Sequence, residues 1–184
     1  MFAVLSVCWT WPLATHLTDS IPGEPGDNFS FLWNLWWMRH VLATTNVAYF
    51  RTTHLFFPFG TDIVNASHTA LPAFVAATVF RSWSVITAQN VLVLIYVFAN
   101  MAVMYALAWD MTAERRPAIM AAVVFGLSPY LAAHLPGHFE LMAAWLLPAF
   151  ALLLRRALHL LGDEAVRHAA AQSESDTPSV RDLC

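Results

Sequence analysis

Long apolar runs separated by short polar breaks are the dominant pattern along this chain of 184 residues. The runs at 87–109, 117–135 and 139–154 are predicted to be helices that cross a bilayer, which takes about 20 mainly apolar residues. A fourth run, at 2–17, has neither the positively charged start nor the small-residue cleavage site of a signal peptide. It is therefore predicted to be a short first transmembrane helix. The fold class that follows is an all-α integral membrane protein with four transmembrane helices.

Composition points to the same class. Hydrophobic residues make up 59% of the chain and charged residues 11%, whereas a soluble domain carries about 25% charged residues. The continuous apolar runs are unlike the alternating strands of an outer-membrane barrel. The formal net charge of −3 and the lack of a basic patch exclude a nucleic-acid partner. Cys8 and Cys184 stand at opposite ends of the chain, so neither a disulfide nor a zinc site is predicted.

Arginines give the predicted orientation in the membrane. Pairs of arginines occupy 115–116 and 155–156, and arginines in short loops mark the cytoplasmic side. Residues 18–86 and 134–140 are then external. The chain is accordingly expected to be a multi-pass protein of the inner (cytoplasmic) membrane, with membrane lipid as a partner.

The long first external loop, 18–86, is predicted to hold juxtamembrane helices. In the first of them, at 29–44, aromatic positions share one face, whereas Ser30, Asn34 and Arg39 tend toward the other. The positions on the aromatic face are Phe29, Leu32, Trp33, Trp36, Trp37, His40 and Val41. This arrangement is typical of a helix that lies in the membrane interface, where tryptophan is favoured.

Three further segments complete the predicted organisation. Residues 67–82 are apolar but too short to span comfortably, and are predicted to be a second juxtamembrane helix. The stretch HLFFPFG, at 54–60, is read as an aromatic turn. Residues 159–184 are polar and are predicted to form a disordered cytoplasmic tail, which leaves 1–158 as the membrane module.

The stretch PGEPGDNFSFLWNLWW, at 22–37, places two acids directly before the aromatic helix. One reading is structural, because Asp27 or Asn28 would make a good N-cap before Phe29. The other is functional, because a carboxylate held at the lipid–water boundary can bind a divalent cation or act as a general base on a lipid-linked substrate. The residues alone leave both readings open.

At several stretches the chain resembles the GT-C superfamily of polytopic membrane glycosyltransferases. The matching stretches are GDNFSFLWNLWWMRH (26–40), HLFFPFG (54–60), LPAF (71–74) and GHFELMAAWLLPAFALLLRRAL (137–158), the last of which is similar to bacterial members of unassigned specificity. The resemblance covers about residues 5–158. Because family members are usually several times longer, it corresponds to their N-terminal part, whether the chain is a truncated product or a stand-alone module.

The resemblance implies an activity and a site. Family members transfer a sugar from a polyprenyl-phosphate donor at the external face of the membrane. Asp27 matches the position of the family's catalytic aspartate, and Glu140 stands where many relatives place a second acid. Asp27 is also the expected ligand of a divalent cation, Mg or Mn.

Further site residues and two alternatives remain at this level. His138, Arg39, Arg51 and His54 are expected to bind the phosphate-bearing substrate. The pattern of His134, His138 and Glu140 is also compatible with a metal site, but Pro136 and Gly137 would interrupt a helix there. The alternative to an enzyme is a small non-catalytic membrane protein that binds or scaffolds lipid-linked substrates.

Polar residues inside the apolar run at 87–109 have a structural explanation. Asn90 and Asn100 are expected to make hydrogen bonds between helices, worth about 1 kcal/mol each.

Overall fold

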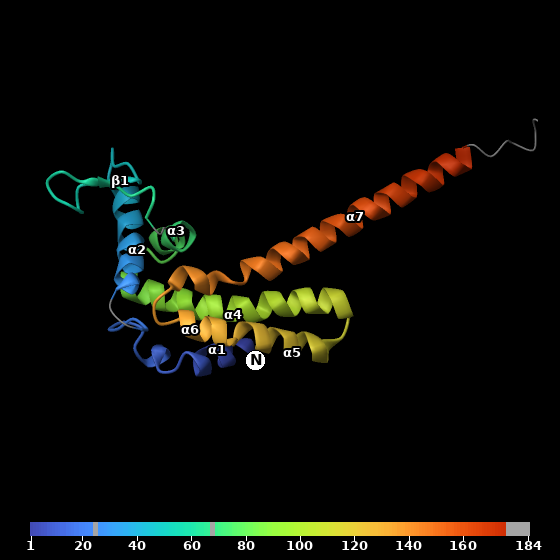
Figure 1. Ribbon diagram of the computed structural model, residues 1–184, viewed down its shortest axis with the longest axis horizontal. Helices are drawn as coiled ribbons and strands as arrows, with labels where there is room; N and C mark the ends of the chain where they lie inside the picture. The colour runs from blue at the N-terminus through green and yellow to red at the C-terminus, as the bar shows by residue number, and fades with distance from the viewer. Residues whose placement is uncertain (24–25, 67–68, 176–184) are drawn as a thin grey trace, which may run out of the picture.

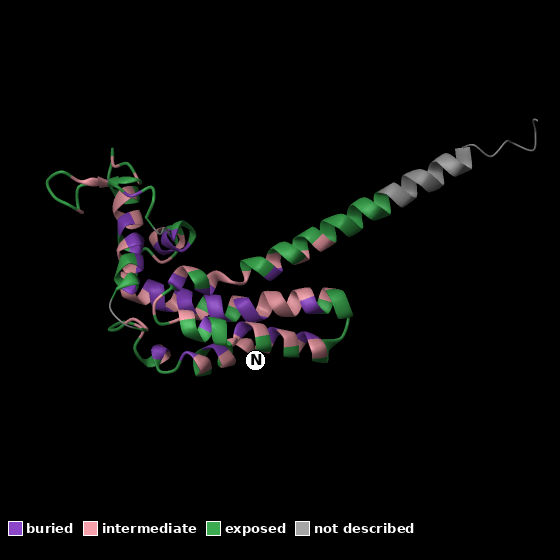
Figure 2. Cartoon of the chain, in the orientation of Figure 1, coloured by how far each residue is buried: buried purple, intermediate pink, exposed green. Residues whose placement is uncertain are grey.

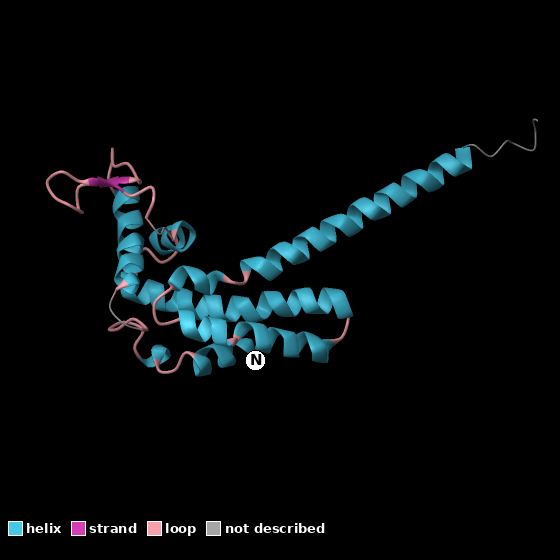
Figure 3. Cartoon of the chain, in the orientation of Figure 1, coloured by secondary structure: helices cyan, strands magenta, loops and turns pink. Residues whose placement is uncertain are grey.

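The computed structural model describes residues 1–23, 26–66 and 69–175, and these are mostly helical (Figure 1). The helices are α1 (Phe2–Trp9), α2 (Asp27–Ala43), α3 (Ala70–Thr78), α4 (Val85–Thr112), α5 (Arg115–Gly126), α6 (Pro129–His134) and α7 (Leu146–Ser175). Two short 3-10 helices are η1 (Leu13–Thr15) and η2 (Phe139–Ala143). A small antiparallel hairpin pairs β1 (Arg51–Thr52) with β2 (Thr61–Asp62) between α2 and α3 (Figure 3).

Three segments of the described chain are long and apolar enough to cross a membrane: Val85–Thr112, Arg115–His134 and Phe139–Glu164. They coincide with three of the runs predicted from hydropathy. The chain therefore has the helices expected of a membrane protein.

The first predicted span, at 2–17, is not a continuous helix. α1 ends at Trp9, after eight residues. Proline at position 12 lacks an amide hydrogen and disfavours helical geometry at Trp11, so the chain turns there before the short η1. Eight residues of α-helix rise only about 12 Å, which is less than half of a bilayer core. The prediction of four spans is thus not confirmed.

α7 also departs from the prediction for its end of the chain. The helix continues to Ser175, through much of the segment predicted to be a disordered tail. Figure 1 shows α7 diverging from α4 toward its C-terminal part. Residues 176–184 lie outside the described part of the chain.

The two ends of α4 carry different groups. At one end, Asp110 accepts hydrogen bonds from Arg155 Nε at 2.9 Å and Arg156 Nε at 3.0 Å, which fixes α7 against α4. At the other end, α2 runs across α4 at a steep angle, and α3 packs on α2 (Figure 1). The loop that follows α6 lies at this second end, and so does η2. We refer to this end as the α2 end.

α4 and α5 approach closely along a row of small residues. Ala118, Ala122 and Gly126 recur every four residues, which places them on one face of α5, and all three are buried. A Cβ added at Gly126 would collide with the Met101 side chain and would lie 2.9 Å from the Met101 backbone nitrogen. Small residues of this kind let two membrane helices bring their backbones together.

Two buried asparagines on α4 donate hydrogen bonds to the loop after η1 and to η2. Asn90 Nδ2 donates to the carbonyl oxygens of Leu17 at 3.0 Å and Ser20 at 2.7 Å. Asn100 Nδ2 donates to the Met142 carbonyl oxygen at 3.0 Å, which anchors η2. The prediction was hydrogen bonds between helices; Asn90 instead bonds to carbonyls of a loop, and Asn100 bonds to a carbonyl of the 3-10 helix η2.

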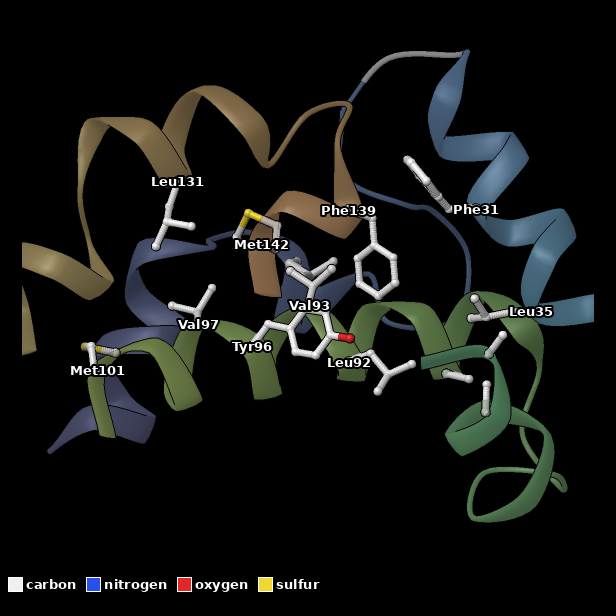
Figure 4. Packing of buried hydrophobic residues seen from close by; sticks show 14 of the residues in the cluster. Phe31, Leu35, Leu92, Val93, Tyr96, Val97, Met101, Leu131, Phe139 and Met142 are labelled. Atoms are coloured by element: carbon white, nitrogen blue, oxygen red, sulfur yellow. The ribbon is translucent and has the colours of Figure 1, made fainter. Parts of the chain in front are cut away.

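An aromatic contact joins α2, α4 and η2 in the core (Figure 4). The Phe139 ring stacks on Tyr96 with centroids 5.3 Å apart, and its centroid lies 6.2 Å from that of Phe31. Leu35 and Met142 are fully buried in the same cluster. The residue directly before Glu140 is therefore a core residue, and this fixes where Glu140 lies.

Outside this core, α5 and α7 present large apolar side chains on their surface (Figure 2). Val124 is 72% exposed and Leu147 is 71% exposed. Such surfaces suit contact with lipid or with further helices.

Replacing Gly126 with alanine tests the close approach of α4 and α5. The added methyl group meets backbone as well as side chain, so the free energy of unfolding should fall by about 1–3 kcal/mol. Thermal unfolding of the variant and of the unmodified chain in the same detergent measures the change. Gly162→Ala on α7 is the matched control, because a Cβ there meets nothing within 4 Å. Equal stability of the two variants would contradict the packing described.

Candidate functional site

Gly26 rather than an acid caps the start of α2. Its φ of +127° lies in a region that favours glycine, and no side-chain capping bond forms there. The prediction that Asp27 or Asn28 is the N-cap is therefore wrong. Asp27 is the first residue of the helix, where the positive end of the helix dipole favours a carboxylate, and its side chain is exposed.

Asn28 instead joins two loops that are distant in sequence. Its Nδ2 donates to the carbonyl oxygens of Pro22 at 2.9 Å and Pro136 at 2.6 Å, and the residue is only 2% exposed. Gly23 packs against the same proline so closely that a Cβ would collide with the Pro136 carbonyl. Pro22, Gly23 and the start of α2 are thereby held against the loop that leads into η2.

A cavity of about 450 Å³ opens beside this junction, and Asp27 and Glu140 both line it. Its remaining lining residues are Phe29, Ser30, Phe31, Trp33, Asn34, Leu55, Ile63 and Ala66. The two acids that the resemblance singled out thus meet at one cavity, although they come from α2 and η2.

Glu140 has an unusual environment. Its Oε2 atom is buried and has no hydrogen-bond partner among the described residues. Glu140 also borders a second cavity of about 590 Å³, which lies between α6, η2 and the start of α7 and is lined mostly by apolar residues such as Leu131 and Leu147. A buried, unpartnered carboxylate oxygen is costly, and a ligand that donates a hydrogen bond to it would remove part of that cost.

Polar residues of α2 line the cavity together with Phe29 and Trp33 from the predicted aromatic face. Ser30 and Asn34 line it together with Asp27, at spacings of three and seven residues that put them on one helical face. Phe29, predicted to belong to a single aromatic face, is 57% exposed, whereas Trp37 is 1% exposed. Apolar residues surround much of α2, so spacing alone did not identify the face that packs.

Arg39 caps α3 instead of facing the cavity. Its guanidinium donates to the carbonyl oxygens of Ala76 at 3.1 Å, Phe80 at 3.0 Å and Trp83 at 2.7 Å. These carbonyls lie in the last turn of α3 and in the turn that follows it, where the Phe80 carbonyl also accepts a hydrogen bond from the Trp83 amide. Burial lowers the pKa of Arg39, but a guanidinium remains charged in proteins. Arg39 therefore positions α3 on α2.

The other residues expected to bind substrate do not line the cavity. Arg51 is exposed on β1. His54 packs against α2, with its ring 5.4 Å from Trp36 and 5.0 Å from His40. His138 is exposed next to Phe139. Of the six site residues predicted from sequence, Asp27 and Glu140 alone are among the residues that line the cavity.

The histidine pattern does not build a metal site in the described part of the chain. α6 ends at His134, as the following proline and glycine predicted, and His134 Nδ1 donates to the Tyr130 carbonyl oxygen at 2.7 Å. The His134 and His138 rings lie 5.3 Å apart. No group of three or more His, Cys, Asp or Glu residues there could hold an ion.

No protein-family model, curated protein or solved structure matches this chain. Ser30, Trp33 and Asn34 line the cavity but were not predicted from the sequence to be site residues. The spacing of Ser30 and Asn34 from Asp27, three and seven residues, could have identified them, because it places them on the same helical face.

Replacing Asn28 with alanine should release the loop at 134–138 from the acid-bearing turn. Two carbonyls in partly buried hydrogen bonds would lose a donor, at a cost of about 1–3 kcal/mol in the free energy of unfolding. Amide hydrogen exchange should become faster in 134–140 than in α5. The exposed Asn65→Ala is the control. Unchanged exchange in 134–140 would show that Asn28 does not hold this junction.

Proposed function

We propose that this chain forms the site of a membrane glycosyltransferase of GT-C type, which transfers a sugar from a polyprenyl-phosphate donor at the external face of the membrane. The observation that carries the proposal is the meeting of Asp27 and Glu140 at one cavity. Sequence resemblance named these two acids separately, and neither is near the other in the chain.

The position of the cavity supports the proposal. It lies at the α2 end, away from the end of α4 where Asp110 pairs with Arg155 and Arg156. If the arginine-rich end is cytoplasmic, the cavity opens on the external side. That is the level at which a lipid-linked sugar presents its reactive carbon.

The two carboxylates have complementary roles in such a transfer. The acceptor hydroxyl oxygen attacks the anomeric carbon, and the bond from that carbon to the phosphate oxygen breaks with its electron pair leaving on the phosphate. Asp27, exposed at the cavity, takes the proton of the acceptor hydroxyl. Glu140, which also lines the cavity, accepts a hydrogen bond from the sugar and so orients it.

A divalent cation also fits these residues. The carboxylates of Asp27 and Glu140 and the hydroxyl of Ser30 are the kind of oxygen ligands that Mg²⁺ and Mn²⁺ prefer. A cation here would compensate for the lack of a cationic side chain among the described lining residues. When bound, the ion would neutralise the charge that develops on the departing phosphate.

Transfer should depend on both acids. Asp27→Asn keeps the size of the side chain and removes its basicity, so the rate should fall by about 10²–10⁴-fold. Glu140→Gln should also slow transfer. The measurement is release of labelled sugar from a polyprenyl-phosphate donor by the chain in lipid nanodiscs.

Asp19→Asn is the control, because Asp19 is a carboxylate of the same segment that does not line the cavity. Full activity of Asp27→Asn would exclude Asp27 as the base. Donor binding without transfer by the unmodified chain would favour the non-catalytic alternative, and no donor binding would end the proposal.

Single-cysteine labelling tests the orientation. In a background without Cys8 and Cys184, Ser20→Cys should react with a membrane-impermeant thiol reagent in intact cells, and Thr112→Cys should react only after permeabilisation. Both positions are exposed in the fold, so protection reports the membrane and not burial. Labelling of Thr112→Cys in intact cells would reverse the orientation and move the cavity to the cytoplasmic side.

A further inference from the structure

Trp33 lines the cavity and packs against a second tryptophan, Trp37. Its ring stacks on that of Trp37, with centroids 5.5 Å apart and planes 8° from parallel. Trp37 is 1% exposed, and its indole nitrogen donates to the Tyr49 carbonyl oxygen at 2.8 Å. An aromatic ring at the cavity wall is therefore supported by a second ring that is buried and hydrogen-bonded.

The rest of the lining gives the chemistry of a matching ligand. Asp27, Ser30 and Asn34 form a polar row along α2, and Glu140 adds a second carboxylate. A pyranose ring has an apolar C–H face and a rim of hydroxyl groups. It can stack on an aromatic side chain through the first and bond to polar groups through the second.

We propose that Trp33 is a stacking platform for a pyranose ring and orients it toward Asp27 and Glu140. This inference rests on the proposed function for the identity of the sugar donor, and it adds the residue that recognises the ring. It also sets a preference. Because the described lining residues include two carboxylates and no cationic side chain, a neutral pyranose should bind better than a uronic acid.

Binding of free glycosides tests the platform separately from transfer. The probes are methyl glucoside, methyl glucuronide and the open-chain polyol glucitol, added to the chain in sugar-free phosphatidylcholine nanodiscs. Saturation-transfer NMR should show methyl glucoside bound through its ring C–H protons, with weaker binding of the glucuronide and none of glucitol. Trp33→Leu should bind methyl glucoside about five- to tenfold more weakly, and Trp33→Phe should retain part of the affinity.

Trp36→Leu is the matched control, because Trp36 belongs to the same ring cluster but does not line the cavity. A second measurement does not depend on the folding of a variant. In the otherwise unmodified chain labelled with 5-fluorotryptophan, methyl glucoside should shift the fluorine signal of Trp33 more than that of Trp36. Equal shifts, or equal affinity of Trp33→Leu and the unmodified chain, would overturn the platform.

Comparison with the transfer assay separates the two proposals. Transfer that persists in Trp33→Leu with unchanged donor affinity would remove the platform and leave the glycosyltransferase. Glycoside binding that depends on Trp33, without transfer from a polyprenyl-phosphate donor, would keep the platform and remove the catalytic proposal. A lipid-linked sugar that binds while methyl glucoside does not would overturn recognition of the ring itself.

Discussion

The hydrogen bonds of Asn28 are the contacts on which the candidate site depends. One amide nitrogen donates to the carbonyls of Pro22 and Pro136, which lie before α4 and after α6 in the sequence. Glycine at position 23 allows the two backbones to touch. Asp27 precedes Asn28 directly, and Glu140 follows Phe139, which is packed between α2 and α4. The relative position of the two carboxylates is thus set by an amide on one side and an aromatic core residue on the other.

The remaining support of the site uses the same means, polar side chains that pair with backbone carbonyls. Asn90 holds the loop after η1, Asn100 holds η2, and Arg39 holds the end of α3. Each of these irregular segments would otherwise bring unpaired carbonyls into an apolar environment, where such groups are costly. Substituting Arg39 should therefore disturb the packing of α3 on α2 and leave the residues that line the cavity in place. From the sequence alone, Arg39 was expected to bind phosphate.

Hydropathy predicted the parts of the fold that depend on local composition. The three long apolar helices and the end of α6 at His134 follow from runs and from Pro136, which are local signals. The predicted first span at 2–17 is not confirmed, because Pro12 interrupts a run that is continuous by hydropathy alone. The face of α2 that packs on the core could not be identified from spacing, because apolar residues occupy most of the circumference of this helix. The pairing of Asn28 with Pro136 carries no sequence signal at all, since it depends on how two distant loops dock.

The charge of the cavity constrains the ligand more tightly than its shape. Two carboxylates line it, and one oxygen of Glu140 is buried without a partner in the described structure. The described lining residues include no lysine, arginine or histidine. An anionic group alone would be repelled here, whereas hydroxyl donors or a divalent cation would relieve the unpaired oxygen. A phosphate-linked sugar therefore fits only with its hydroxyls on the acids and its phosphate charge offset by a cation. Under the proposed function, donor binding would therefore depend on a divalent cation, because of the residues that line the cavity.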